Sequence, residues 1–504
     1  MAQDRREIQD RQKRRAEMQK KRIQEQKRLK RRLIAAAAIL AGCAAAIYLI
    51  AREPSYLKPR APKETEPLAV QSEMAATTSP TQAPEPQALA DDPNASRHKP
   101  VTTIHIRAAG DLNVTDKVVS SGIVGSKYDF TRSFIDVAAL LSDADWTVMN
   151  FEGNVCGEPY GSETRSAPPE LLRDLRDVGV DMLQTANSYS VHNGLIGMAA
   201  TVQSIRNAGL IPLGSYASTS EFQRSGGYEI VDIQGIKVAF VAFTKGVGGM
   251  GMPAGNEECV NLLYEDYDST YQKVDSKRIT KILRAAEAEK PDITIAMLHW
   301  GSEYNDTISK TQMEIIELMK KEGVDVILGT HPHTVQKIEF DKSAGTLYAY
   351  SLGDFYGDAS RAGTNYSIIL DLEITKDAGA GTTKVTDFSY FPIYTLSLEE
   401  HEEKEGIPCQ VMRIGTAMQA REGNFVDRIN QSAYDSMQYS LERINDRVKG
   451  IDEQRRLEEE ERRKNGGVSK KKDSKKQEQK PTETVQQTEA AQQTEAAQQG
   501  DKKG

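Results

Sequence analysis

The segment from Ile293 to Phe355 alternates short apolar runs with a helical pattern, and this alternation constrains the fold more than any other feature of the sequence. One apolar run begins at Ile293, an amphipathic period covers Lys310 to Glu322, and a second apolar run extends from Val324 to Leu328. Such runs on either side of a helical period are typical of a βαβ unit whose parallel strands are buried on both faces. Ligands of such units bind beyond the carboxyl ends of the strands. The sequence therefore predicts an α/β fold with a site at these ends.

Histidines follow two of these predicted strands. The chain has only seven histidines, and three of them, His299, His331 and His333, come just after an apolar run in this unit. Imidazole is the commonest transition-metal ligand in proteins. A single histidine beside Pro332 would have an ordinary explanation as a polar loop residue. The prediction of a metal or anion site rests on the three together.

Three predicted strands earlier in the chain each end close to a carboxylate or amide side chain. These side chains are Asp111, Glu152 and Asn187. Oxygen ligands mixed with imidazole nitrogens suit Zn, Mn or Fe better than Ca, which prefers cages made of oxygen alone. Two such ions about 3.5–4 Å apart are a common arrangement for hydrolysing phosphate esters and amides. The same residue types also form turns and helix N-caps, so each position taken alone has a structural explanation.

The N-terminal residues indicate a membrane anchor. Residues 1–32 hold 14 Lys or Arg against 5 Asp or Glu, whereas residues 33–50 carry no charge. Eighteen uncharged residues are near the lower length for a membrane-spanning helix. Basic residues on its N-terminal side place that end in the cytoplasm and the rest of the chain outside. We therefore expect a single transmembrane helix in membrane lipid, with the main domain extracellular.

Two other interpretations of this segment fit less well. Leu40 to Cys43 resembles a lipoprotein processing site at which Cys43 would be lipidated, but the apolar run continues to Ile50 and favours an uncleaved helix. A cleaved signal peptide would have a shorter basic region. The basic segment is more typical of a topology and anionic-lipid determinant than of a nucleic-acid arm, so no nucleic-acid partner is expected.

Composition divides the remainder into a spacer, a domain and a tail. Residues 51–100 are rich in Pro, Ala, Thr and Gln without apolar periodicity and predict a disordered spacer. Residues 101–450 have the composition of a globular α/β domain, and residues 451–504 predict a charged, Gln-rich disordered tail. Three cysteines outside the membrane helix allow at most one disulfide bond and leave one free thiol. They are Cys156, Cys259 and Cys409.

Two local patterns within the domain predict particular elements. The Gln234-Gly235 pair separates two strand patterns and predicts a β-hairpin. Apolar residues from Phe425 to Leu441 recur at helical spacing and include Ile429. They predict a helix that packs on the domain.

Together these motifs resemble the CapA/PgsA family of poly-γ-glutamate capsule-synthesis proteins, which has a metallophosphatase-like fold. The resemblance extends roughly from Thr103 to Leu372. The matching stretches are Gly110-Asp111, Asn150-Phe151-Glu152-Gly153, Ala186-Asn187 with Gly194, His299-Trp300-Gly301-Ser302-Glu303-Tyr304, Gly329 to Gln336, and Tyr350 to Phe355. Family members are typically held by an N-terminal membrane segment with the domain outside, in agreement with the anchor predicted above.

The resemblance implies a calcineurin-like layered α/β sandwich that holds a divalent metal, Mn, Zn or Fe. The implied metal-site positions are Asp111, Glu152, Asn187, His299, His331 and His333. Glu303 would act beside the metal or on the substrate. Asn113 stands where many metallophosphatases carry a further metal-binding histidine, and Asp354 replaces the family's usual Asn.

One loop departs from the family pattern. Residues Asn187 to His192 stand where the family usually has Asn-Asn-His-x-x-Asp, so Ser188 replaces an amide ligand and Tyr189 replaces the histidine expected to protonate the reacting group. Tyrosine donates a proton poorly at neutral pH because its unperturbed pKa is about 10. His192 could substitute if the loop is helical. The catalytic candidates are therefore His192, Tyr189 and Glu303.

These inferences predict a membrane-anchored, extracytoplasmic, CapA-like protein of capsule, poly-γ-glutamate or cell-envelope polymer biosynthesis. It would act either as a metal-dependent hydrolase or transferase, or as a non-catalytic scaffold beside other membrane-bound polymer synthesis or export proteins. The chain has a formal net charge of −8 although its first 32 residues are strongly basic, so the rest is acidic. Direct binding of an anionic polymer would therefore need cations, which a metal site could supply.

Overall fold

The computed structural model describes residues 100–305, 307–402, 406–423 and 429–451, together with residues 454, 455, 457 and 458. The predicted basic segment, membrane helix and spacer, and most of the predicted tail, lie outside these residues. Among the helices that are described, none is long and apolar enough to cross a membrane.

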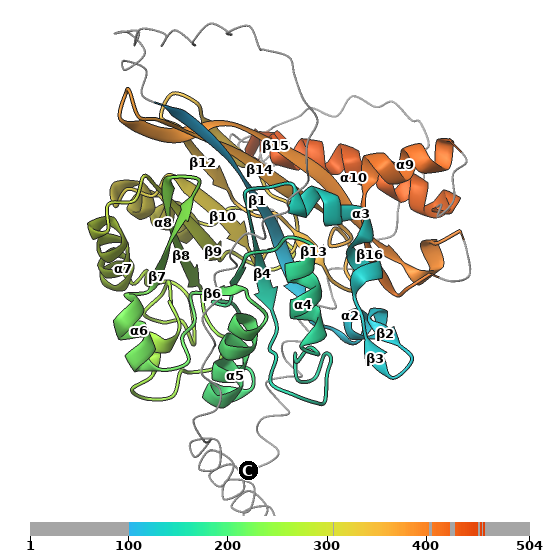
Figure 1. Ribbon diagram of the computed structural model, residues 1–504, viewed down its shortest axis with the longest axis horizontal. Coiled ribbons are helices and arrows are strands. Elements are labelled where there is room, and N and C mark those ends of the chain that lie inside the picture. Colours follow the sequence, from blue (N-terminus) through green and yellow to red (C-terminus); the bar gives the residue numbers. More distant parts are fainter. Residues whose placement is uncertain are drawn as a thin grey trace, which may run out of the picture. The chain divides into compact units, whose positions relative to one another are not determined.

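Two β-sheets form the centre of the domain (Figure 1). The first sheet has the strand order β16-β15-β14-β1-β4-β5-β6, and β13 also pairs with β1. Its strands are β1 (Val101–Asn113), β4 (Trp146–Glu152), β5 (Met182–Gln184), β6 (Ile211–Leu213), β13 (Asp354–Tyr356), β14 (Tyr366–Asp377), β15 (Thr382–Ser397) and β16 (Cys409–Arg413). Strands β1, β4, β5 and β6 are parallel, so their carboxyl ends share one edge.

The second sheet has the order β11-β12-β10-β9-β8-β7. Its strands are β7 (Tyr228–Ile233), β8 (Ile236–Thr244), β9 (Ile293–His299), β10 (Val326–Thr330), β11 (Ile338–Asp341) and β12 (Thr346–Ala349). Strands β8, β9, β10 and β12 are parallel, and β9 and β10 flank a helix as the alternation of apolar runs predicts. The Gln234-Gly235 hairpin is confirmed: both residues have positive φ, 52° and 85°, as the tight turn between β7 and β8 requires.

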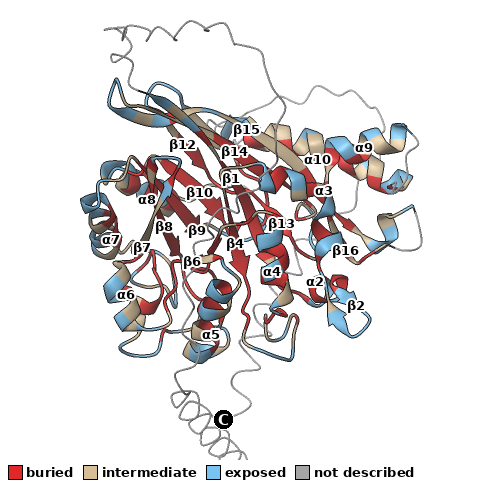
Figure 2. Cartoon of the chain, in the orientation of Figure 1, coloured by how far each residue is buried: buried red, intermediate tan, exposed pale blue. Residues whose placement is uncertain are grey.

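Helices cover the outer face of each sheet. Phe134 of α3 and Leu171 of α4 pack on the first sheet, whereas Ile282 of α7 and Ile315 of α8 pack on the second. A third apolar core fills the space between the sheets, and Figure 2 shows the strands buried and the outer helix surfaces exposed. The α-helices are α2 (Asp116–Ser121), α3 (Thr131–Ser142), α4 (Glu170–Asp177), α5 (Gly194–Asn207), α6 (Thr219–Ser225), α7 (Ser276–Ala288), α8 (Lys310–Lys321), α9 (Ile414–Glu422) and α10 (Gln431–Val448). The mixed α/β sandwich expected from the sequence is thus present. A small hairpin of β2 (Ile123–Val124) and β3 (Lys127–Tyr128) follows α2.

The C-terminal helix differs from its predicted bounds. Helix α10 begins at Gln431, because the side chain of Asn430 accepts a hydrogen bond from the Ala433 amide and caps it. Ile429 lies before the helix, in a bridge with His401, and Phe425 lies outside the described residues. The described cysteines, Cys156, Cys259 and Cys409, are all free thiols.

Gly110 lets two distant strands approach closely. Strands β1 and β13 pair in parallel with Asp111 opposite Asp354, and the Asp111 amide donates to the Gly353 carbonyl at 2.9 Å. A Cβ atom on Gly110 would lie 1.8 Å from that carbonyl oxygen. Only glycine fits here. Because Gly110 has no side chain, β1 and β13 can lie close enough to bring together the carboxylates of Asp111 and Asp354, which are far apart in the sequence.

Replacing Gly110 with Ala is therefore expected to lower the free energy of unfolding by about 1–3 kcal/mol, because β1 and β13 must separate to admit the methyl group. Urea denaturation followed by circular dichroism measures the change. Gly415→Ala is the matched control, since a Cβ there meets nothing within 4 Å and lies in α9. Equal stability of the two variants would show that β1 and β13 do not depend on this contact.

Candidate metal centre

The carboxyl ends of strands from both sheets meet at one point, and the predicted metal-site residues with acidic or imidazole side chains gather there. They are Asp111 near the end of β1, Glu152 at the end of β4, His299 at the end of β9, and His331 and His333 just after β10. All five are buried. The spacing of polar residues after strands thus predicts which side chains come together.

These side chains form three overlapping groups that could each hold a metal ion. In each group, one potential ligand atom per residue lies within 4.8 Å of the others. The groups are Glu152 with His331 and His333, Asp111 with Glu152 and His299, and Asp111 with His333 and Asp354. Because Asp111, Glu152 and His333 each belong to two groups, the arrangement can hold one ion or two neighbouring ions that share a carboxylate.

Glu152 lies at the centre of the cluster. Its Oε1 is 2.9 Å from His299 Nε2, and its Oε2 is 3.8 Å from His333 Nε2. Neither oxygen accepts a hydrogen bond with acceptable geometry from a described residue, and Nδ1 of the buried His331 also has no such partner. Buried polar atoms without partners are costly. A divalent cation would satisfy all three atoms, so the residues fit a metal.

Burial and crowding shift the pKa values at the cluster. Burial, followed by the charge of Glu152, raises the pKa of Asp111 to about 7, and burial raises that of Glu152 to about 7. Burial lowers the pKa of His299 to about 3, and it lowers that of His331 well below its usual value. Both imidazoles are therefore neutral at pH 7, which is the form that binds a metal.

The backbone around His331 and His333 is strained in a way that aims their side chains. Their φ angles are 91° and 57°, in a region that favours glycine. The His331 amide donates to Asp111 Oδ2 at 3.0 Å. A Cβ on Gly329 would lie 1.9 Å from the Tyr350 carbonyl oxygen, which explains the glycine in this motif. Strain held in place by surrounding contacts is common at functional sites.

Asp354 belongs to the cluster, although the sequence marked it only as a departure from the family pattern. Its Oδ1 is 2.7 Å from His333 Nδ1 and accepts a hydrogen bond from Asn113 Nδ2 at 3.1 Å. Burial alone would lower the pKa of His333, but the carboxylates of Asp354 and Glu152 raise it well above its usual value. A metal at Nε2 would have to displace the proton of that nitrogen, while Asp354 would keep the other proton on Nδ1, as carboxylates beside metal-binding histidines do.

Asn150 and Asn187 tie the cluster to its surroundings. Asn150 Nδ2 donates to Asp111 Oδ1 at 2.5 Å. Asn187 Nδ2 donates to the side-chain oxygen Oδ1 of Asn150 at 3.2 Å and to the backbone carbonyl of Phe151 at 2.6 Å. Asn187 Oδ1 accepts a hydrogen bond from the Tyr189 amide at 3.0 Å. The structure therefore gives Asn187 a role in fixing the loop, and its predicted role as a metal ligand stays a prediction.

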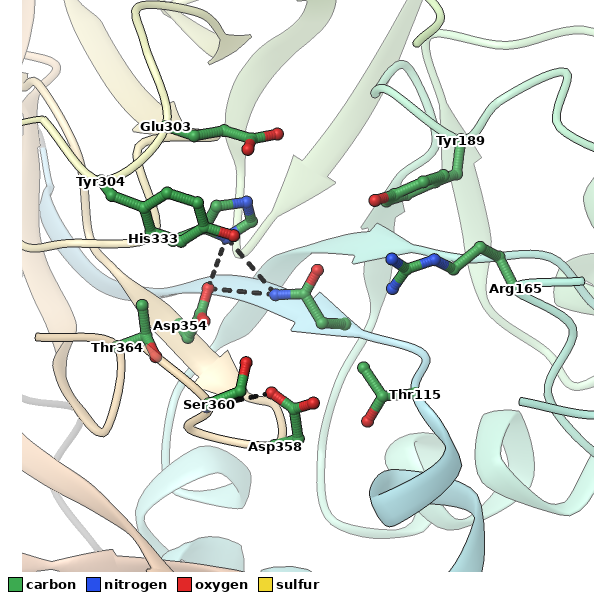
Figure 3. A pocket seen from close by; sticks show the side chains of 11 residues that line it. Thr115, Arg165, Tyr189, Glu303, Tyr304, His333, Asp354, Asp358, Ser360 and Thr364 are labelled. Carbon is green, nitrogen blue, oxygen red and sulfur yellow. Dashed lines mark hydrogen bonds and ion pairs between the residues drawn. The ribbon is translucent and has the colours of Figure 1, made fainter. Parts of the chain in front are cut away.

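The three catalytic candidates occupy different surroundings. Tyr189 and Glu303 line a pocket of about 130 Å³ beside the cluster (Figure 3). His192 is exposed, and its Nε2 lies 2.9 Å from the Glu163 carbonyl oxygen. The condition for its predicted role fails, because the loop forms turns and α5 begins only at Gly194. The structure therefore does not bring His192 into the cluster.

The pocket opens onto His333 and Asp354, so a bound molecule would reach the cluster from this side (Figure 3). Burial raises the pKa of Tyr189, which therefore keeps its proton at neutral pH. The residues that line the pocket are Asn113, Thr115, Arg165, Tyr189, Glu303, Tyr304, His333, Asp354, Asp358, Ser360 and Thr364. The sequence alone did not identify Arg165 as a site residue, because it lies in an irregular loop where no periodicity or motif marks it.

A family model described as "Bacterial capsule synthesis protein PGA_cap" matches residues 105–359, slightly more than half of the chain. This chain belongs to that family. The resemblance drawn from the motifs is confirmed, and the matched residues contain every member of the cluster.

Two curated relatives carry related names. The "PGA biosynthesis protein CapA" of Bacillus subtilis (strain 168) is 27% identical over 259 residues, which are 50% of this chain and 63% of that protein. The "Capsule biosynthesis protein CapA" of Bacillus anthracis is 24% identical over 292 residues, which are 56% of this chain and 67% of that protein. The chain thus spans somewhat under two thirds of the first relative's length.

Solved structures with some similarity include one from Bacillus subtilis and one from Staphylococcus aureus. The calcineurin-like phosphoesterase YfkN from Bacillus subtilis is matched with a TM-score of 0.37 and 16% identity, over 68% of this chain and 98% of that chain. A putative 5'-nucleotidase from Staphylococcus aureus is matched with a TM-score of 0.37 and 10% identity, over 62% of this chain and 54% of that chain.

Proposed function

We propose that this protein acts in the biosynthesis of a bacterial capsule or related cell-envelope polymer, as a divalent-metal-dependent hydrolase or transferase. Membership of the capsule synthesis family and the names of the two CapA relatives support the biological role. The metal-dependent chemistry is carried by one observation: the buried Glu152 carboxylate has no hydrogen-bond donor of acceptable geometry among the described residues, yet it has imidazole nitrogens within 4 Å.

The residues suit a reaction at a phosphate or amide centre. Asp111, Glu152, His299, His331 and His333 would hold a divalent cation, which supplies polarisation of the attacked group and a more acidic bound water. Asp354 would keep the Nδ1 proton on His333 and so orient its ring. Glu303 lines the pocket and can accept a proton there, whereas Tyr189 can donate a hydrogen bond to the leaving group.

The site of action follows from the N-terminal sequence. We place residues 33–50 in the cell membrane as a single span, with the N-terminus in the cytoplasm and the domain of residues 101–450 outside. This topology suits work on an exported polymer alongside other membrane-bound synthesis or export proteins. An anionic polymer is a fitting ligand only with cations present, because the chain beyond residue 32 is acidic.

A second candidate is a non-catalytic scaffold of a polymer synthesis or export complex. It is favoured by the loop at Ser188 and Tyr189, where no imidazole occupies the expected proton-donating position, and by the exposed His192. Loss of a general acid typically lowers a rate by two to four orders of magnitude. A metal site kept for binding alone would tolerate that loss.

Metal content tests the proposal directly. The full chain, purified in detergent without chelator, is expected to carry about one to two equivalents of Mn, Zn or Fe by mass spectrometry. The double variant His331→Ala/His333→Ala should lose most of this metal because two nitrogen ligands are gone. His105→Ala is the control, since His105 pairs with Asp371 away from the cluster. Wild-type protein that binds no metal even when titrated would rule out the metal-dependent enzyme.

A further inference from the structure

We propose that Arg165 and Tyr189 form a subsite for an anionic group of the substrate, a phosphate or a carboxylate, beside the metal centre. This inference deepens the proposed function, since it names the charge of the molecule that the same pocket takes. Figure 3 shows the guanidinium of Arg165 and the hydroxyl of Tyr189 pointing into the pocket from one wall.

Among the described residues, the guanidinium of Arg165 contacts Tyr189 and Val114. It lies over the Tyr189 ring, 4.3 Å from the ring centroid, and Nη1 donates to the Val114 carbonyl at 3.2 Å. Arginine has five N–H donors in a planar fork that matches the two oxygens of a carboxylate or phosphate. These contacts use part of the fork and fix its plane, so the remaining donors can receive an oxyanion with little further ordering.

The two residues are held together by one asparagine. The backbone N–H of Asn154 donates to the backbone carbonyl of Arg165 at 2.6 Å, and its side-chain Nδ2 donates to the backbone carbonyl of Tyr189 at 2.8 Å. Arg165 has a φ of 51°, a conformation that is costly for an arginine and that persists only when neighbours enforce it. The loop is therefore built to present this side chain at a fixed place in the pocket wall.

The charges of the pocket restrict an anion to this wall. Glu303, Asp354 and Asp358 line the other parts of the pocket and would repel a negative group. Arg361 lies over the Tyr304 ring, 4.6 Å from its centroid, and is not among the residues that line the pocket. Arg165 is thus the one arginine among the residues that line the pocket, and no lysine is among them. A substrate would place its anionic group there and its reacting centre toward His333.

Calorimetric titration of the manganese-loaded full chain with inorganic phosphate and with glutarate tests this subsite. Arg165→Gln is expected to weaken binding of the preferred anion about tenfold or more while leaving the manganese content unchanged. Arg165→Lys should be intermediate, because it keeps the charge and loses the fork. Phosphate bound more tightly than glutarate identifies a phosphate subsite, and the reverse order identifies a carboxylate subsite.

Arg224→Gln is the matched control, since it removes the same charge from an exposed position on α6. The inference is overturned if the wild-type protein binds neither anion, or if Arg165→Gln and a folded Arg165→Lys bind as tightly as Arg224→Gln. Failure of the proposed metal site gives a different pattern. In that case manganese does not bind, and a loss of anion binding in Arg165→Gln without metal still supports the subsite.

Discussion

The double variant Ser188→Asn/Tyr189→His is expected to hydrolyse a chromogenic phosphodiester about two to four orders of magnitude faster than the wild-type protein. Tyr189 lines the pocket beside the cluster, and burial raises the pKa of its hydroxyl, so it is a weak acid at the position where the family resemblance leads us to expect a proton donor. Ser188 Oγ lies 3.0 Å from His299 Nε2, so an amide at this position would reach the cluster. Turnover of bis-p-nitrophenyl phosphate in excess manganese measures the gain.

Two controls separate restored catalysis from other effects. Tyr189→Phe should show no gain, because it removes the hydroxyl without adding an acid. Adding His331→Ala and His333→Ala to the double variant should abolish the gain if the reaction depends on bound metal, as proposed. A double variant that binds manganese and still shows no hydrolysis would favour the non-catalytic scaffold over the enzyme.

The five clustered residues could be predicted because the rule that connects them is local. A polar side chain within a few residues of a parallel strand's end must lie at the carboxyl edge of its sheet, whatever the rest of the fold. Asp111, Glu152 and His299 follow this rule in three different strands. The rule does not predict that the two sheets pack face to face with their carboxyl edges adjacent. That arrangement depends on packing between distant parts of the chain.

Asp354 and His192 show where this reasoning fails. Asp354 joins the cluster because β13 pairs with β1, more than 240 residues earlier, through a close contact at Gly110 and Gly353. No local pattern specifies that pairing. His192 was expected near the reacting group on the assumption of a helical loop, but the chain makes successive turns there and directs the ring toward the Glu163 carbonyl. The spacing between two residues predicts where their side chains lie only when the backbone conformation between them is known.

In metal-free protein at about pH 8, Glu152→Gln is expected to raise the free energy of unfolding by about 3 kcal/mol. Burial raises the pKa of Glu152 from 4.5 to about 7. A carboxyl group with a raised pKa stabilises the folded state fully only below its unfolded pKa, and this contribution is lost as the pH rises from about 4.5 through 7. Glutamine has no charge to bury, so the gain should vanish near pH 4.5. Urea denaturation in chelator at both pH values measures it.

Saturating manganese should reverse this order, because a ligand that binds only the folded state stabilises it in proportion to its affinity, and glutamine is the weaker metal ligand. Glu314→Gln makes the same charge change on the exposed face of α8 and should leave stability unchanged in both conditions. If Glu152→Gln were no more stable than wild type in chelator at about pH 8, the carboxylate would not be desolvated in the way its burial implies. If Glu152 destabilises the empty fold and stabilises the manganese-loaded one, its carboxylate contributes to metal binding and not to the stability of the fold alone.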